Sequence, residues 1–136
     1  MDYSQLKKAI VRLGEMLNAY LDETSKRGNL EKEGIQDSLV KRFEYAIEMS
    51  WKTCKRHLSE EGFAEAKTGS PKSIIRLAAE AGIIADAQSW IVFINARQST
   101  SHDYSEEKAD KVLNVVEGFY NAAKELYESL TGEELV

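Results

Sequence analysis

The sequence predicts an all-α protein, an antiparallel up-and-down four-helix bundle with one additional short helix. Apolar residues recur every three to four positions through most of the 136 residues, which is the period of an amphipathic helix. No stretch of useful length alternates apolar and polar residues as a half-buried strand does, and the chain has a single proline. Helices that are apolar along one stripe bury those stripes against one another, so a bundle is the expected architecture.

The first two expected helices cover residues 2 to about 23 and about 30 to 61. The apolar stripe of the first is Leu6, Ile10, Leu13, Leu17 and Tyr20. The stripe of the second is Leu39, Phe43, Ile47, Trp51, Cys54 and Leu58, in which two aromatic rings are expected to anchor the core. Gly62 is a plausible stop for the second helix.

The second half of the chain predicts a loop and three helices. Residues 63–69 are expected to form the loop, and Ser70-Pro71 is a typical helix start, with Ser as cap and Pro at the first helical position. The expected helices cover about 71–81, about 85–98 and about 105–130. The last of them carries the stripe Ala109, Val112, Val116, Phe119, Ala123, Leu126 and Leu130.

Composition and charge limit the class of protein. A length of 136 residues fits one domain, residues 1–136, with a substantial core. A net charge of −5 argues against a general nucleic-acid coat protein, because such binding needs many phosphate contacts. The single cysteine, Cys54, lies on an apolar face and is expected to be a buried, inert thiol in a cytoplasmic protein. No signal peptide or bilayer-spanning apolar run is evident.

The stretch from Arg97 to Tyr104 holds the densest set of reactive groups. Ser99, Thr100 and Ser101 compete with the helical backbone for hydrogen bonds, so a helix break is expected there. A break would let Arg97 and His102 converge, whereas residues five apart on one helix diverge by about 140°. Arg matches phosphate oxygens, and His transfers protons near neutral pH. The simpler alternative is that Arg97 pairs with a carboxylate and His102 is a surface cap.

The sequence lacks the motifs of several other known kinds of functional site. The sequence has no glycine-rich phosphate loop and no dinucleotide fingerprint. Its only histidines are His57 and His102, and neither belongs to a zinc or di-iron spacing. We therefore expect no metal and no cofactor. The basic cluster of Lys52, Lys55, Arg56 and His57 is interpreted as favourable charge at a helix C-terminus rather than as an RNA track.

Three blocks of the sequence stand out together. They lie in residues 37–53, which contain Arg42-Phe43-Glu44 and Trp51-Lys52-Thr53, in residues 70–84, and in the stretch Arg97 to Tyr104 with its Ser-His-x-Tyr pattern. These blocks resemble the nucleotidyltransferase substrate-binding protein family, which belongs to the HEPN group of helical bundles. The resemblance covers most of the chain. Family members usually have Asp-Arg-Asn where this chain has Ala96-Arg97-Gln98, so Arg97 is expected to lack an acidic neighbour that holds it.

The resemblance implies a homodimer of bundles and a partner, a small, separately encoded nucleotidyltransferase. In related HEPN toxins, Arg-x4-His-x-Tyr is a metal-independent ribonuclease motif, and the partner transfers AMP to the Tyr. Carried across, Arg97 is a phosphate clamp, His102 the proton-transfer residue and Tyr104 the AMP acceptor, with Gln98 and Ser101 as supporting residues. A dimer through the fourth and fifth helices would pair two such motifs, giving a base and an acid for cleavage through a 2′-hydroxyl.

Three functions are therefore open. The preferred one is an accessory, substrate-binding subunit of a separately encoded nucleotidyltransferase, as in a toxin-antitoxin pair. The runner-up is a ribonuclease toxin silenced by AMP transfer to Tyr104. The third is a plain interaction scaffold in which Arg97 and His102 are structural. The chain is not expected to be a nucleotidyltransferase itself, because it lacks the metal-binding Asp-x-Asp on a sheet.

Overall fold

The structure, a computed structural model, describes residues 1–22, 26–100 and 106–135. In chain order its elements are α1 (Ser4–Leu21), α2 (Asn29–Glu60), the 3-10 helix η1 (Ala64–Thr68), α3 (Pro71–Glu80), α4 (Ala87–Thr100) and α5 (Glu106–Thr131). The described residues contain no strand, so the all-α prediction is confirmed. None of the helices within these ranges is both long and apolar enough to cross a bilayer.

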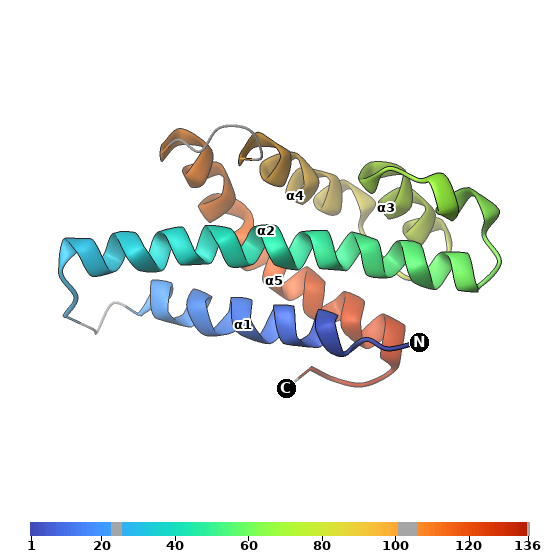
Figure 1. The fold of residues 1–136 in the computed structure, drawn as a ribbon, viewed down its shortest axis with the longest axis horizontal. Helices are drawn as coiled ribbons and strands as arrows, with labels where there is room; N and C mark the ends of the chain where they lie inside the picture. The colour runs from blue at the N-terminus through green and yellow to red at the C-terminus, as the bar shows by residue number, and fades with distance from the viewer. Residues whose placement is uncertain (23–25, 101–105, 136) are drawn as a thin grey trace.

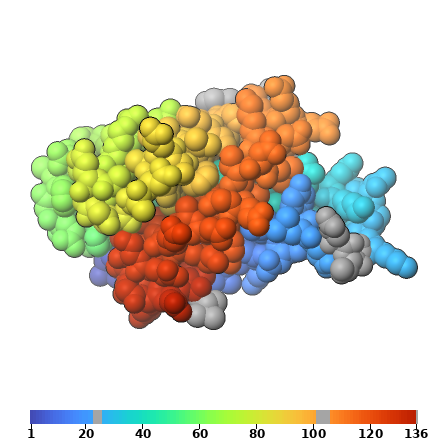
Figure 2. Space-filling view, turned by 180° about the vertical axis from the view of Figure 1, so that it is seen from behind, coloured from blue at the N-terminus to red at the C-terminus, as the bar shows by residue number. Residues whose placement is uncertain are grey.

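The longest helix, α2, is the element on which the others are arranged. It runs the length of the molecule, with α1 beside it in the opposite direction and with α4 and the short α3 along its other side (Figure 1). Seen from behind, α5 crosses the molecule diagonally between α1 and the pair α3 and α4 (Figure 2). The four longer helices form the bundle, and α3 is the additional short helix that the sequence predicted.

Four aromatic rings from three helices form the centre of the core. The Phe119 ring of α5 meets Phe43 of α2 at 5.1 Å between centroids, and Trp90 and Phe93 of α4 at 5.5 Å each, all edge-on. Such perpendicular pairs are the favoured aromatic geometry. Phe43 was among the residues predicted to anchor the core.

Two aromatic positions of the predicted stripes are not fully buried. Trp51 packs against the core but is only partly buried, and its indole Nε1 donates a hydrogen bond to Glu48 at 3.3 Å. Tyr20 is 39% exposed at the end of α1. In both residues a polar atom stays within reach of solvent, which is a common arrangement for amphipathic rings.

Side-chain caps explain where α3 and α4 begin. The Ser70 hydroxyl accepts a hydrogen bond from the Ser73 amide, and Pro71 occupies the first turn, as predicted. The Asp86 carboxylate accepts from both the amide and the hydroxyl of Ser89, so α4 starts at Ala87 rather than near residue 85. These hydrogen bonds lower the pKa of Asp86.

Two boundaries differ from the prediction. Residues 64–68, expected as a loop, form a 3-10 helix whose Ala66 is fully buried against the core. The predicted helix break at Ser99 to Ser101 is wrong for its first two residues, since α4 continues through Thr100. The hydroxyls of Ser99 and Thr100 bond to the carbonyls of Ala96 and Arg97, which accommodates both residues inside the helix.

A hydrogen bond also ties the start of the described chain to the end of α2. The Tyr3 hydroxyl lies 2.8 Å from His57 Nδ1, and His57 Nε2 lies 3.6 Å from Glu61. Burial of the phenol raises the pKa of Tyr3. His57, which the sequence placed in a basic cluster, therefore has a structural role in joining α1 to α2.

Candidate functional site

The candidate site is built around Arg97, in the last turn of α4. Its Nη1 lies 3.1 Å from Glu44 Oε2, and its Nε lies 3.7 Å from Glu48 Oε1. Both carboxylates come from α2, one helical turn apart, so they line up along the side of α2 that faces α4. Of the simpler interpretation of the sequence, the pairing of Arg97 with a carboxylate is confirmed, whereas the capping role of His102 lies outside the described residues.

Glu44 is the more deeply buried of the two carboxylates in this cluster. The same Oε2 that faces Arg97 accepts a hydrogen bond from the Thr100 hydroxyl at 3.2 Å, and its Oε1 lies 3.5 Å from the Lys41 ammonium. Its side chain is only 11% exposed. A carboxylate this deep is retained only where cations and donors compensate for its lost hydration, and Arg97, Lys41 and Thr100 supply that compensation.

Glu48 forms the outer part of the same cluster. Its side chain is 34% exposed and lies 3.7 Å from the ammonium of Lys52, in addition to its contact with Arg97. The Trp51 indole donates to its second oxygen. Glu48 therefore connects the Arg97 guanidinium to the exposed surface of α2.

The Arg97 contacts are ion pairs without well-aligned hydrogen bonds. Arg97 Nε and Nη1 and Glu44 Oε1 are buried, and within the described ranges none of the three atoms makes a hydrogen bond of good geometry. Charge-assisted hydrogen bonds are about twice as strong as neutral ones. Arg97 and Glu44 therefore leave part of their hydrogen-bonding capacity unused. The Arg97 side chain is 23% exposed, which leaves part of the guanidinium accessible to an anion.

The remaining predicted site residues divide into two groups. His102, Tyr104 and Ser101 lie outside the described residues, so their predicted roles stay predictions. Gln98 lies on α4 and is exposed. The described elements end at Thr100 and resume at Glu106, so the segment that contains His102 and Tyr104 follows the Arg97 turn directly.

The acidic neighbour missing at position 96 is replaced by carboxylates from another helix, so its absence does not leave Arg97 free. Ala96 is buried, and the carboxylates come from α2, about fifty positions earlier in the chain. Glu44 and Glu48 were not predicted as site residues. A signal was present, because Glu44 stands between Phe43 and Ile47 on the apolar side of α2, and a charge on a buried face needs a partner.

The chemistry open to this cluster is the binding of an anion by a positioned guanidinium. Glu44 and Glu48 lie against its buried Nε and Nη1, so Nη2 is the guanidinium nitrogen left to contact a phosphate. No group of three or more potential metal ligands occurs among the residues that the structure describes. Cys54 is a poor nucleophile, because burial raises the pKa of its thiol to about 12.

Comparison with known proteins identifies relatives over nearly the whole chain. Residues 1–132 match the family described as "Nucleotidyltransferase substrate binding protein like". A protein of Haemophilus influenzae named "Probable ribonuclease HepT" is 32% identical over 102 residues, which cover 71% of this chain and 70% of that protein. The matched range takes in all the described helices.

Two solved structures share the fold. HI0074 of Haemophilus influenzae, described as revealing the fold of a substrate-binding domain of a nucleotidyltransferase, superposes with a TM-score of 0.85 at 26% identity and covers 95% of this chain and 98% of its own. A protein of Thermus thermophilus gives a TM-score of 0.72 at 25% identity, covering 93% and 98%. With its helical bundle and its family match over residues 1–132, the chain belongs to the nucleotidyltransferase substrate-binding-protein-like family.

Proposed function

We propose that this chain is the accessory, substrate-binding subunit of a separately encoded minimal nucleotidyltransferase and works with it as a homodimer in the cytoplasm. The observation that carries the proposal is the family match over residues 1–132, which takes in the entire bundle rather than one motif. The carboxylates nearest the site are paired with Arg97, Lys41 and Lys52, which supports assigning the transfer chemistry to the partner.

The pairing of Arg97 also supports an accessory role. Glu44 and Glu48 lie among Arg97, Lys41 and Lys52, so the cluster keeps only a small positive charge and attracts a highly charged RNA weakly. A guanidinium held in this way suits a docking or positioning function at the surface where α4 ends. Tyr104, seven positions after Arg97 in the sequence, is the proposed acceptor of AMP from the partner.

The first experiment measures this transfer. The chain is incubated with the minimal nucleotidyltransferase encoded beside it, ATP and Mg²⁺, and its intact mass is recorded. We expect an increase of one or more AMP units, formed when the Tyr104 oxygen attacks the α-phosphorus of ATP and pyrophosphate leaves. Tyr104→Phe should abolish the increase, whereas Tyr120→Phe, on α5, should retain it. No mass increase, together with no complex by size-exclusion chromatography, contradicts the proposal.

The second candidate is a metal-independent ribonuclease, favoured by the 32% identity to the Haemophilus protein named a probable ribonuclease. In this reaction the RNA 2′-oxygen attacks the adjacent phosphorus and the 5′-oxygen leaves. One group takes the 2′-proton and another protonates the leaving oxygen. His102 from each protomer would fill these two roles, with Arg97 binding the phosphate between them.

Expression of the chain alone separates the two candidates. A ribonuclease should arrest growth and cleave RNA in the presence of EDTA, and His102→Ala should relieve both effects. His57→Ala is the matched control, because His57 is engaged with Tyr3 at the end of α2 rather than with the Arg97 site. Normal growth and intact RNA remove the ribonuclease candidate and leave the accessory role unaffected.

A further inference from the structure

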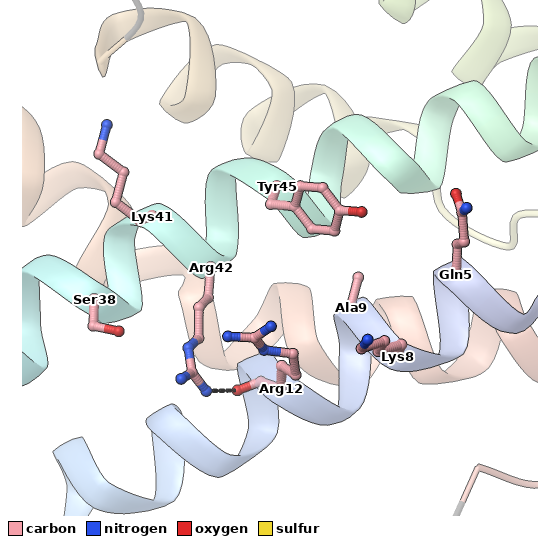
Figure 3. A pocket seen from close by; sticks show the side chains of 8 residues that line it. All are labelled: Gln5, Lys8, Ala9, Arg12, Ser38, Lys41, Arg42 and Tyr45. Atoms are coloured by element: carbon pink, nitrogen blue, oxygen red, sulfur yellow. Dashed lines mark hydrogen bonds between the residues drawn. The ribbon is translucent and has the colours of Figure 1, made fainter.

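A cationic groove runs between α1 and α2, and it does not include Arg97. Its volume is about 510 Å³, within the range of small-molecule sites. The lining residues come from both helices (Figure 3): Gln5, Lys8, Ala9, Arg12, Ser38, Lys41, Arg42 and Tyr45. Four of these eight residues are cations and none is acidic, although the chain as a whole carries a net charge of −5.

The cations of this groove are only partly compensated. Arg42 donates to the backbone carbonyl of Arg12 at 2.7 Å, and its nearest carboxylate, Glu15, is 4.0 Å away with a side chain that is 69% exposed. Lys8 and Arg12 are exposed and form no ion pair with any described residue. Figure 3 shows the side chain of Arg12 turned back toward that of Arg42. Like charges gathered in this way create a local positive potential that favours a multiply charged anion.

Tyr45 adds an aromatic surface to the same groove. Its side chain is among the large exposed hydrophobic groups of the chain, at 56% exposure. Figure 3 shows its ring lying along α2, on the far side of Arg42 from Lys41. An exposed ring beside cations can stack on a nucleobase while the cations bind phosphates.

The short span of the groove cations favours a small phosphate-bearing ligand over a long nucleic acid. Lys8 and Arg12 are one helical turn apart on α1, and Arg42 faces them from α2, so the three cations span a short chain of phosphates. A long nucleic acid would need a continuous basic track, and this acidic chain does not offer a strong one. We propose that the α1–α2 groove binds a nucleoside triphosphate, with its phosphates on Lys8, Arg12 and Arg42 and its base on Tyr45.

Lys41 connects this groove to the Arg97 cluster. It lines the groove, yet its ammonium lies 3.5 Å from Glu44, whose other oxygen faces Arg97. In Figure 3 its side chain points away from Arg12 and Arg42, toward the side of α2 where α4 ends. Lys41 therefore belongs to the wall of the groove rather than to the phosphate-binding set.

Isothermal titration of the purified full chain tests the proposal, with ATP, inorganic triphosphate, adenosine and a single-stranded RNA oligonucleotide as separate probes. Mg²⁺ is omitted and EDTA added, so that side-chain cations are the only counter-charge. We expect ATP to bind at millimolar concentration or below, and more tightly than adenosine. Arg12→Gln and Lys8→Gln should each weaken ATP at least 5-fold. Tyr45→Ala should weaken ATP but leave triphosphate unchanged.

Two controls fix the location of binding. Lys67→Gln and Arg76→Gln remove exposed cations from η1 and α3, outside the groove, so neither should change ATP affinity. Circular dichroism of every variant checks that the bundle is intact. Absence of ATP binding, or binding that Lys8→Gln and Arg12→Gln leave unchanged, overturns the proposal. RNA that binds more tightly than ATP, with the same sensitivity to these variants, replaces the nucleotide with a nucleic acid and also overturns it.

This inference goes beyond the proposed function and does not depend on it. The titration uses the chain without a nucleotidyltransferase, and the groove variants leave Tyr104 and Arg97 in place. If ATP binds but no AMP is transferred, the groove stands and the acceptor role of Tyr104 falls. If AMP is transferred but ATP does not bind the isolated chain, the acceptor role of Tyr104 stands and the proposed nucleotide groove falls.

Discussion

Glu44 determines the environment of the candidate site at the scale of a single residue. Its carboxylate is nearly buried, and it faces cations from two helices, Lys41 on α2 and Arg97 on α4. Removing one partner of such a pair is costly because the other charge stays buried without compensation. Glu48 is more exposed and lies farther from Arg97. Removing its carboxylate therefore leaves less buried positive charge without a counter-charge.

Glu44→Gln tests this difference. We expect the substitution to lower the free energy of unfolding by about 1–3 kcal/mol, since Arg97 keeps its partly buried charge and loses its closest counter-charge. Glu48→Gln should cost less. Urea denaturation followed by circular dichroism measures both values.

The double variant Glu44→Gln/Arg97→Gln is the decisive control. If the two residues interact as their 3.1 Å separation implies, the double variant should be more stable than the sum of the single losses predicts. Strictly additive losses would mean that the pair contributes no coupling energy and that Glu44 does not hold Arg97.

Cys54 gives a pH-dependent prediction. Burial raises the pKa of its thiol from 9.0 to about 12, so folding favours the neutral form. The corresponding contribution to stability is present in full below pH 9.0 and is lost as pH rises toward about 12. At pH 8 the folded protein should react with a thiol reagent far more slowly than the urea-unfolded protein. Equal rates would contradict the buried position, and Cys54→Ala should reduce the loss of stability above pH 9.

At the scale of the elements, local chemistry accounts for most helix ends but not for all of them. The cap at Ser70 and the proline after it place the start of α3 correctly. At Ser99 and Thr100, the same hydroxyl chemistry that predicted a break instead bonds back to the preceding turn. Sequence alone does not decide between these outcomes, because the Thr100 hydroxyl also meets Glu44 from another helix.

Two glycines inside helices behave differently because of their neighbours. A Cβ at Gly34 on α2 meets nothing within 4 Å, so Gly34→Ala should raise the free energy of unfolding by about 0.5–1 kcal/mol through helix propensity. A Cβ at Gly14 on α1 would lie 2.6 Å from the Tyr120 hydroxyl on α5. Gly14→Ala should therefore gain nothing or lose stability, because the ring must move. Thermal melts compare the two variants, and an equal gain in both would contradict close packing of α1 on α5.

At the scale of the whole molecule, the aromatic cluster joins three helices into one core. Phe119 contacts rings of both α2 and α4 and is fully buried. Phe119→Ala should cost about 3–5 kcal/mol, because it removes a buried ring and leaves a cavity between all three elements. Chemical denaturation should show this loss as a single transition, whereas Tyr45→Ala, at an exposed position, should cost much less. A small loss at Phe119 would mean that the cluster is not central to the fold.

The fold was more predictable than the site, for a physical reason. Helical periodicity is local, and stripes such as Leu6, Ile10 and Leu13 fix which faces pack together. The pairing of Arg97 with Glu44 and Glu48 depends on how α4 lies on α2, which local patterns do not encode. The same is true of the groove, since Lys8 and Arg42 appear in sequence as ordinary solvated charges of separate helices and meet only when α1 packs on α2.

The hydrogen bond from Trp51 to Glu48 gives the protein an intrinsic optical reporter. The Trp51 indole and the Arg97 guanidinium contact the same carboxylate, that of Glu48. The only other tryptophan of the sequence, Trp90, is packed among the aromatic rings of the core. In a Trp90→Phe background, emission would come from the Trp51 indole alone. Ligands or partners that draw Arg97 away from Glu48 would then change the colour or intensity of that emission, so occupancy of the site becomes visible without any attached dye.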